Sequence, residues 1–356
     1  MLFIQVLESK HESYKKGGMM ATLILNNDSI SVSLESDHII IKRHNTESAT
    51  QTLPIKDVER VVVIGRPAIT FPVLARFMDR GIPCVFLTKG QRWRGTLDFG
   101  QSRNVARRML QYDKLRDADI CLSLAKGAIV AKLRNCRRVI QRLCANRGMP
   151  IPEGDEHWRG LNGCIADINI STDLDSVRGV EGIGAFHYFR LIDGFMPFGF
   201  SFPARSRRPP LDPANAVLSF VYTSLMNEVA ASVRAHALDV GLGFLHQDRE
   251  RSPSLALDLM EVFRPGFADL LVLGMISHDR LDPDHDFESD EKTGGVYLSS
   301  TARRKVLVAC ESAMSRSFKP LGKSKRTTLR LAIDEQVLAF VKFLEDGEPM
   351  EFFRLA

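Results

Sequence analysis

The segment DLMEVFRP (258–265) places two carboxylates three residues apart, at Asp258 and Glu261. On a helix, side chains at this spacing share one face. Residues 255–257 and 259–260 are all apolar, so a buried pair would need a cation or an arginine to offset the cost of desolvation. An exposed pair on an amphipathic helix is the alternative, and this segment alone does not separate the two.

A histidine and a third acid lie in glycine-rich segments elsewhere. His246 ends the segment GLGFLH, and Glu181 lies in RGVEGIGAFHYF with glycines at 179, 182 and 184. Two carboxylates and one imidazole suit Mn²⁺ or Mg²⁺, with water and phosphate oxygens completing the coordination. Each residue also has a simpler interpretation: His246 as a hydrogen-bonded structural side chain, and Glu181 as an acid that favours the positive end of a helix.

A basic loop precedes a long apolar helix in the segment ARSRRPPLDPANAVLSFVYTSLMNE (204–228). Arginines on a loop stiffened by prolines suit contacts with phosphates. A surface loop without a ligand is the alternative. The candidate nucleic-acid contacts in this segment are Arg205, Arg207, Arg208 and Asn215.

The charge of the chain is unevenly distributed. The formal net charge is +5, yet residues 91–147 carry 14 Lys or Arg against 4 Asp, and residues 303–330 carry 9 against one Glu. Residues 279–292 carry 7 acids against 2 bases. The two basic stretches suit a nucleic-acid partner, whereas the acidic stretch is expected to be a loop between helices.

Composition excludes several classes of protein. With 44% hydrophobic and 26% charged residues, the chain is not expected to be disordered. The six cysteines form no CxxC pair, which argues against a zinc ribbon and favours the reduced thiols of a cytoplasmic protein. No apolar run reaches 18 residues, so neither a transmembrane helix nor a membrane partner is expected. No GxxxxGK[ST] motif occurs, which is consistent with chemistry that uses no ATP.

The 356 residues predict two domains after a short extension. Residues 1–20 form an extension of unknown role, residues 21–103 a small β-rich domain, and residues 104–356 a larger all-α C-terminal domain, giving an α+β fold. Within the β-rich domain we expect strands over 21–26, 30–35, 38–44, 60–65 and 84–88, and a helix over 68–80. Helical spacing predicts helices over 105–147, 180–195, 213–240, 255–263, 267–275, 300–316 and 325–346.

Taken together, these segments resemble CRISPR-associated protein 1, the integrase of spacer acquisition. The resemblance lies in VEGIGAFHYF, RRPPLDPANAVLSFVY, GFLH, SLALDLMEVFRP and GGVYLS, and in the long segment QYDKLRDADICLSLAKGAIVAKLRN. It covers nearly all of the chain except the first 20 residues and the extreme C-terminus. Two places depart from the family: Gly184 and Phe186 stand where Ala and Arg are frequent, and Val262 stands where Pro is frequent. Neither change removes a proposed ligand.

The resemblance implies that Glu181, His246 and Glu261 bind Mg²⁺ or Mn²⁺, and that Asp258 is an auxiliary acid. It implies a reaction in which the 3′-hydroxyl of a short double-stranded DNA fragment attacks a phosphodiester of CRISPR repeat DNA, with the metal neutralising charge on the phosphate. It also implies a homodimer, two of which bracket a dimer of CRISPR-associated protein 2.

Two other functions remain open at this point. A metal-free, DNA-binding scaffold subunit for a partner nuclease would keep the basic segments without needing Glu181, His246 and Glu261 to converge. An unrelated hydrolase would keep the convergence without a basic groove leading from it.

Overall fold

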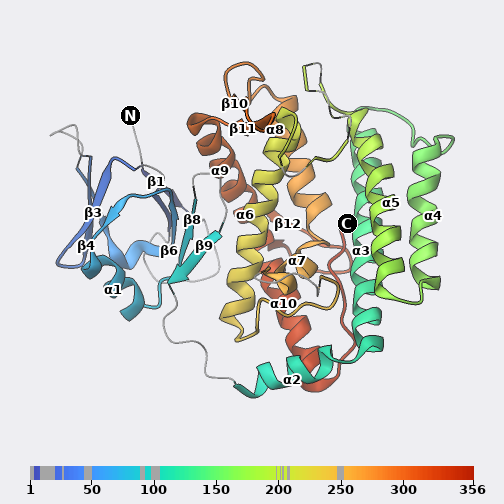
Figure 1. The fold of residues 1–356 in the computed structure, drawn as a ribbon, viewed down its shortest axis with the longest axis horizontal. Coiled ribbons are helices and arrows are strands. Elements are labelled where there is room, and N and C mark those ends of the chain that lie inside the picture. Colours follow the sequence, from blue (N-terminus) through green and yellow to red (C-terminus); the bar gives the residue numbers. More distant parts are fainter. Residues whose placement is uncertain are drawn as a thin grey trace. The chain divides into compact units, whose positions relative to one another are not determined.

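A computed structural model of the chain describes residues 4–8, 21–25, 28–43, 50–88, 93–97, 105–197, 199–200, 202, 204–206, 209–246 and 252–356. The chain divides into two compact units, Met1–Gln101 and Ser102–Ala356 (Figure 1). The first is rich in strands and the second is mostly helical. The predicted fold class, an α+β chain with a β-rich N-terminal part and a helical C-terminal part, is confirmed.

A five-stranded sheet forms one layer of the N-terminal unit. Its order is β1-β2-β6-β8-β9, with parallel pairing of β2 with β6 and of β6 with β8, and antiparallel pairing at both edges. The strands are β1 (Ile4–Glu8), β2 (Ala21–Leu25), β6 (Val58–Ile64), β8 (Cys84–Leu87) and β9 (Trp93–Leu97). The first 20 residues, expected to be an extension of unknown role, therefore contribute an edge strand to this sheet.

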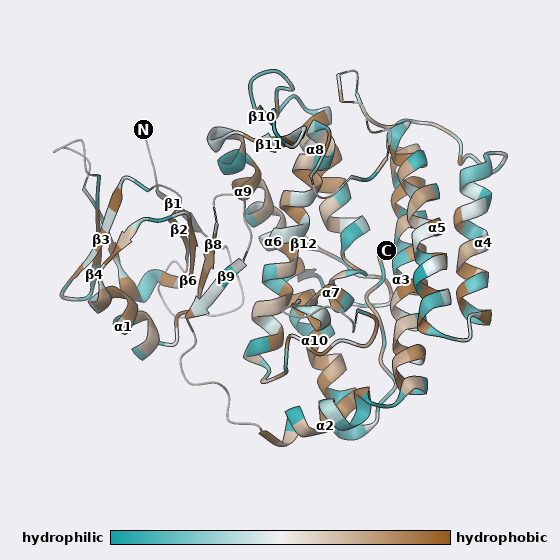
Figure 2. Cartoon of the chain, viewed as in Figure 1, coloured by the Kyte–Doolittle hydropathy of each residue, from teal (hydrophilic) through white to brown (hydrophobic). Residues whose placement is uncertain are grey.

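A second sheet, of order β5-β4-β3-β7, completes the N-terminal unit. Its strands are β5 (Gln51–Pro54), β4 (His38–Arg43), β3 (Ile30–Glu35) and β7 (Ala68–Ile69); the unit also holds helix α1 (Phe71–Asp79) and the short 3-10 helix η1 (Ile55–Asp57). Apolar side chains of the two sheets and of α1 form one buried core, among them Leu23, Val32, Val61 and Phe77. Several of these strands are strongly apolar in Figure 2, because the core-facing side chains of a sheet must be buried. The helix expected over 68–80 is shorter than predicted, since residues 68–69 pair with β3.

Nine α-helices and one π-helix make up most of the described part of the C-terminal unit. They are α2 (Val105–Leu115), α3 (Ala118–Asn146), α4 (Glu156–Ile170), α5 (Leu174–Asp193), α6 (Pro213–Ala235), α7 (Ser254–Met260), α8 (Leu270–Ser277), α9 (Ser300–Ser315) and α10 (Leu329–Asp346), together with the π-helix η2 (Arg264–Asp269) between α7 and α8. The single helix expected over 105–147 is divided, because the side chain of Asp117 accepts hydrogen bonds from the first turn of α3. Helix α4 was not predicted from the sequence.

Helices α3, α4 and α5 pack side by side (Figure 1). The C-terminal segment fixes α3 from another side: Asn135 Nδ2 donates hydrogen bonds to the carbonyls of Val262 (2.8 Å) and Phe353 (3.1 Å). The rings of Phe263 and Phe353 stack with centroids 4.7 Å apart. These contacts join α3 to the turn that follows α7, where Glu261 lies.

The acidic stretch 279–292 is partly ordered as a hairpin rather than as a simple loop. Strands β10 (Phe287–Asp290) and β11 (Gly295–Leu298) pair antiparallel, and Lys305 contacts the buried Asp286 at 2.6 Å. A smaller strand pair joins β12 (Ser317–Phe318) to β13 (Thr327–Thr328). The segment is therefore a structured connection and not the simple loop that was predicted, since the hydroxyl of Thr293 donates a hydrogen bond to Asp290 and closes the turn.

Helix α6 is, by length and composition, the one described helix that could cross a membrane. Half of its apolar window is buried inside the C-terminal unit, which is the usual state of a core helix. It begins where the sequence predicted, at Pro213, with the carboxylate of Asp212 accepting a hydrogen bond from the backbone N–H of Asn215.

The packing of α5 can be tested with two apolar residues on opposite sides of this helix. Val177 is fully buried and Ile183 is 55% exposed. We expect Val177→Ala to lower the free energy of unfolding by about 2 kcal/mol, because it removes two buried carbons and leaves a cavity. Ile183→Ala removes more carbon but should change stability by less than about 0.5 kcal/mol. Urea unfolding followed by circular dichroism measures both; equal losses would contradict this packing.

Candidate functional site

The centre of the site is a buried lysine that joins two acids from different helices. Lys132 of α3 forms ion pairs with Glu181 of α5 and with Glu261, which ends α7. The distance from Nζ to Glu261 Oε2 is 2.7 Å. Lys132 and Glu261 are buried, and the side chain of Glu181 is 23% exposed. Two of the three proposed metal ligands therefore converge on one point, and an ammonium group occupies it.

Glu261 has a second cationic neighbour on the next turn. Arg264 Nη1 lies 2.9 Å from Glu261 Oε1. Burial alone would raise the pKa of Glu261, but the cations Arg264 and Lys132 outweigh it and lower that pKa to about 2. For Lys132 the balance is similar: burial lowers the pKa of its ammonium, and the two glutamates more than reverse this. Both groups are therefore charged at neutral pH. The burial of Glu261 rules out the alternative of an exposed carboxylate pair on an amphipathic helix.

Asp258 lies one helical turn before Glu261 but contacts residues 244–246 instead of Lys132. Its carboxylate is fully buried and accepts hydrogen bonds from the backbone N–H groups of Phe244 (2.6 Å), Leu245 (2.8 Å) and His246 (3.1 Å). The ring Nδ1 of His246 lies 2.6 Å from Asp258 Oδ1. A proton on Nδ1 then leaves Nε2 with a free lone pair, which is the form of histidine that binds metals.

Glycine at position 243 allows this close approach. A Cβ atom there would lie 2.4 Å from Asp258 Oδ2 and 3.0 Å or less from the backbone of Ser254. The loop of residues 241–246 can therefore place three backbone donors around one carboxylate. This explains the GLGFLH spacing physically, because any larger residue at 243 would push His246 away from Asp258.

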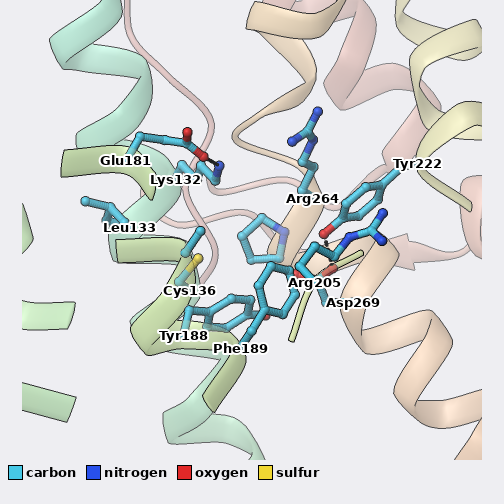
Figure 3. A pocket seen from close by; sticks show the side chains of 12 residues that line it. Lys132, Leu133, Cys136, Glu181, Tyr188, Phe189, Arg205, Tyr222, Arg264 and Asp269 are labelled. Carbon is cyan, nitrogen blue, oxygen red and sulfur yellow. Dashed lines mark hydrogen bonds and ion pairs between the residues drawn. The ribbon is translucent and has the colours of Figure 1, made fainter. Parts of the chain in front are cut away.

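A small pocket opens beside Lys132 and Glu181 (Figure 3). Its other polar lining residues include Arg205, Tyr222, Arg264 and Asp269. The hydroxyl of Tyr222 donates to Asp269 Oδ1 at 2.6 Å, and the guanidinium groups of Arg264 and Arg205 lie 4.9 and 5.3 Å from the centre of the Tyr222 ring. Burial raises the pKa of Asp269 to about 6, opposed by Tyr222 and by the two arginines. The pocket is thus rich in cations, as a site for a phosphate would be.

The loop that precedes α6 is held together from within. Arg205 Nη1 donates to Asn215 Oδ1 at 2.6 Å, and Asn215 Nδ2 donates to the carbonyl of Ala204 and to the carboxylate of Asp212. Asn215 is completely buried. It has no surface for the DNA contact that the sequence suggested, so we correct its role to that of ordering the loop. Arg207 and Arg208 lie outside the residues that the structure describes.

Many bases of the stretch 91–147 also have internal partners. Arg107 pairs with Glu345 at 2.7 Å, and Arg138 and Arg142 each donate to the carbonyl of Ala356 at 2.7 Å. The expectation that this whole stretch contacts phosphates is therefore too broad, because part of its charge stabilises the helical unit itself.

The donor set fits a divalent metal in type. Carboxylates of Glu181 and Glu261 converge, and the imidazole of His246 offers Nε2. Among the described residues, however, no group of three or more His, Cys, Asp or Glu side chains is arranged closely enough to hold a metal ion. His246 does not join the two glutamates at their meeting point.

Sequence reasoning missed Lys132, Arg264, Tyr222 and Asp269. Arg264 could have been found, since it follows Glu261 by three residues and a buried acid needs a cation. Lys132 carries a weaker signal: it falls on a helix face whose other members, such as Ile129, Leu133 and Cys136, are buried and apolar. Tyr222 and Asp269 carry no local signal, because only the fold brings them together.

A family profile and the sequences of known proteins point to the same family. The profile of the family described as "CRISPR associated protein Cas1" matches residues 23–312. The CRISPR-associated endonuclease Cas1 3 of Thermus thermophilus is 30% identical over 328 residues, which cover 92% of this chain and 95% of that protein. The CRISPR-associated endonuclease Cas1 of Mycobacterium tuberculosis is 28% identical, over 90% of this chain and 94% of that one.

Solved structures share the fold at lower identity. A casposase bound to an integration product superposes with a TM-score of 0.81 and 22% identity, covering 94% of this chain and 93% of that one. A CAS1 protein from Thermotoga maritima gives a TM-score of 0.77 at 21% identity, covering 93% and 98%. Both share the fold of this chain.

The raised pKa of Asp269 predicts a pH-dependent contribution to stability. A carboxyl whose pKa is higher in the folded state stabilises the fold below its unfolded pKa, and this contribution is lost as the pH rises through about 6. Wild type should therefore lose up to about 3 kcal/mol relative to Asp269→Asn between pH 3.5 and pH 7. Urea unfolding at both pH values measures the difference.

Tyr222→Phe serves as the companion variant for this measurement. It removes a hydrogen bond to the ionised carboxylate of Asp269, so the pKa should rise further and the loss of stability should extend to higher pH. A stability difference between wild type and Asp269→Asn that is constant with pH would contradict the assignment.

Proposed function

Since the chain belongs to the CRISPR-associated Cas1 family, we propose that it is a divalent-metal-dependent DNA integrase and endonuclease of CRISPR adaptation. It would join the 3′-hydroxyl ends of short DNA fragments to a phosphodiester of the repeat by transesterification. The observation that carries this proposal is the convergence of Glu181 and Glu261, from separate helices, on a single cationic point in the helical unit.

The proposed ligands of Mg²⁺ or Mn²⁺ are Glu181, Glu261 and His246. When bound, the metal would lower the pKa of the attacking hydroxyl and neutralise charge on the phosphate. Asp258 fixes the ring of His246 and directs Nε2 outward, as carboxylates behind metal-binding histidines do. Arg264 stabilises the charge of Glu261 and lies at the edge of the pocket, where its guanidinium can also face a phosphate.

No side chain of the site needs to act as a nucleophile. The DNA hydroxyl supplies the attacking oxygen, one phosphodiester replaces another, and the departing 3′-hydroxyl takes up a proton. The task of this chain is therefore to orient the two DNA ends and to supply positive charge near the reacting phosphate. Arg205, Arg264 and Lys132 line one pocket and supply that charge.

The proposed DNA contacts are the loop arginines Arg205, Arg207 and Arg208 and the outward-facing bases of residues 91–147 and 303–330. The partners we propose are double-stranded DNA, a second copy of this chain, and CRISPR-associated protein 2, with two dimers in each complex. Support comes from related folds, which include the casposase with its integration product and a Cas6-RT-Cas1–Cas2 complex at a TM-score of 0.75.

The alternative is a metal-free scaffold that binds DNA for a partner nuclease. Surface cations alone would serve it, and it would have no use for two buried acids, Asp258 and Glu261, on one short segment. The burial of Asp258 and Glu261 therefore favours the enzyme.

The central test is strand joining with a His246→Ala variant. Its strand joining should fall to background in Mn²⁺ or Mg²⁺, because the site loses its one imidazole donor. His236 provides a matched control: it also pairs with an aspartate (Asp334, 2.9 Å) and is 21% exposed, against 23% for His246. The assay incubates protein and CRISPR-associated protein 2 with a short duplex and a supercoiled repeat plasmid. His236→Ala should keep activity; wild-type joining by His246→Ala, or joining without metal, would refute the proposal.

Asp258 and Glu261 should respond differently to raised Mn²⁺. Asp258→Asn loosens His246 but leaves all three ligands, so its strand-joining rate should fall by about 10- to 100-fold and recover partly at high Mn²⁺. Glu261→Ala removes a ligand and should stay inactive. The measurement is the joining rate against Mn²⁺ concentration for both variants. Recovery of Glu261→Ala alone would mean that Asp258 is the ligand and Glu261 the supporting acid. Wild-type rates in both variants would mean that neither carboxylate binds the metal, and would favour the metal-free scaffold.

A further inference from the structure

Lys132 stands out among the lysines of the helical unit because its charged end is buried. Its side chain is 8% exposed, and most of its neighbours on the inner face of α3, such as Ile129, Leu133 and Cys136, are buried and apolar. Burying an ammonium group is costly unless carboxylates surround it. Here Glu181 and Glu261 do so from opposite helices, and Figure 3 shows the lysine and Glu181 end to end beside the pocket.

The position of this ammonium is the point at which the two carboxylates converge. A divalent metal held by the same two acids needs their oxygens about 2.0–2.6 Å from one common point. The Nζ atom lies 2.7 Å from Glu261 and in contact with Glu181. A metal and an ammonium cannot share this place, since both are cations and both need the same oxygens.

We propose that Lys132 is a placeholder cation, whose ammonium holds Glu181 and Glu261 together until a divalent metal displaces it. This inference rests on the proposed metal site. It assigns Lys132 a positioning role: the residue keeps two like charges at binding distance when no metal is present, so that the ligands stay assembled rather than repelling one another.

The pocket beside the site gives the displaced side chain somewhere to go. Lys132 lines this pocket together with Tyr222, Arg264 and Asp269. A lysine side chain has a flexible four-carbon stem and three donors, so Nζ can turn from the glutamates toward the pocket. There its charge would join those of Arg205 and Arg264. Metal binding would thus add positive charge on the pocket side as well as at the ligands.

The cost of this arrangement falls on metal affinity. A metal must displace an ion-paired ammonium before it can bind, so the wild-type site should bind Mn²⁺ more weakly than a site without the lysine. The metal-free protein is in turn more stable, because the ammonium of Lys132 neutralises the two carboxylates. Removing the ammonium should therefore lower the stability of the metal-free protein and raise its affinity for Mn²⁺. An ordinary structural ion pair would show only the loss of stability.

The test compares Lys132→Met with Lys305→Met in the full-length chain. Both variants replace a flexible charged side chain by an uncharged one of similar length. Each removes an ammonium that is paired with a buried carboxylate: Glu261, which keeps Arg264, in one case and Asp286 in the other. Metal-free melting temperatures should fall in both, by about 5 °C or more for Lys132→Met. Isothermal titration with Mn²⁺ alone and melting curves with Mn²⁺ provide the readouts.

We expect Lys132→Met to bind Mn²⁺ at least about tenfold more tightly than wild type and to regain its lost melting temperature when Mn²⁺ is added. Lys305→Met should bind Mn²⁺ as wild type does and should gain no more from it. Equal or weaker Mn²⁺ binding by Lys132→Met would overturn the placeholder role and make Lys132 a fixed support of the ligands. No Mn²⁺ binding by wild type would instead remove the proposed metal site itself.

A second measurement needs no variant and covers the case in which Lys132→Met does not fold. Crystal structures of the wild type grown in a chelator and in Mn²⁺ would show the lysine directly. With Mn²⁺ bound, Nζ should have left both glutamates. A metal held by Glu181 and Glu261 while Nζ keeps both ion pairs would refute the proposal.

Discussion

Two carboxylates that face one another inside a protein require a cation between them, and the helical unit is arranged around this requirement. Glu181 and Glu261 come from helices 80 residues apart in the sequence. Like charges at such short range would force one of the acids to take up a proton or the helices to separate. The positive charges of Lys132 and Arg264 prevent both outcomes, and they are the reason why the pKa of Glu261 is low. The rest of the unit holds these four side chains next to one another.

Several features of the fold position the side chains of this cluster. Helix α3 carries Lys132 and, three residues later, Asn135, whose amide holds the carbonyl of Val262 next to Glu261. The π-helix η2 begins at Arg264 and ends at Asp269, so its wider turn brings both residues to the pocket. π-helical turns are frequent at functional sites. The C-terminal segment then closes over the same region through Phe353.

Sequence patterns predicted the layout of the fold well and the site in part. Strong periodicity located most strands of the first unit and the long helices, and Asp212–Pro213 marked the start of α6 correctly. Helix α4 and the hairpin of β10 and β11 were missed, because their stability comes from packing on neighbours rather than from local pattern. Motifs indicated the acids and His246, whose roles as metal ligands stay predictions. Lys132 was not indicated, since an ion pair spanning 49 residues leaves no trace in local spacing.

The two acids of the DLMEVF segment show why burial alone does not define a ligand. Asp258 is balanced by three backbone N–H groups and by the ring of His246, none of which can leave without unfolding the loop. Glu261 is balanced by side-chain cations on flexible stems, which can move. A carboxylate held by fixed dipoles suits a support, whereas one held by mobile charges can exchange them for another cation. The physical difference between a supporting acid and a binding acid is therefore the mobility of what neutralises it.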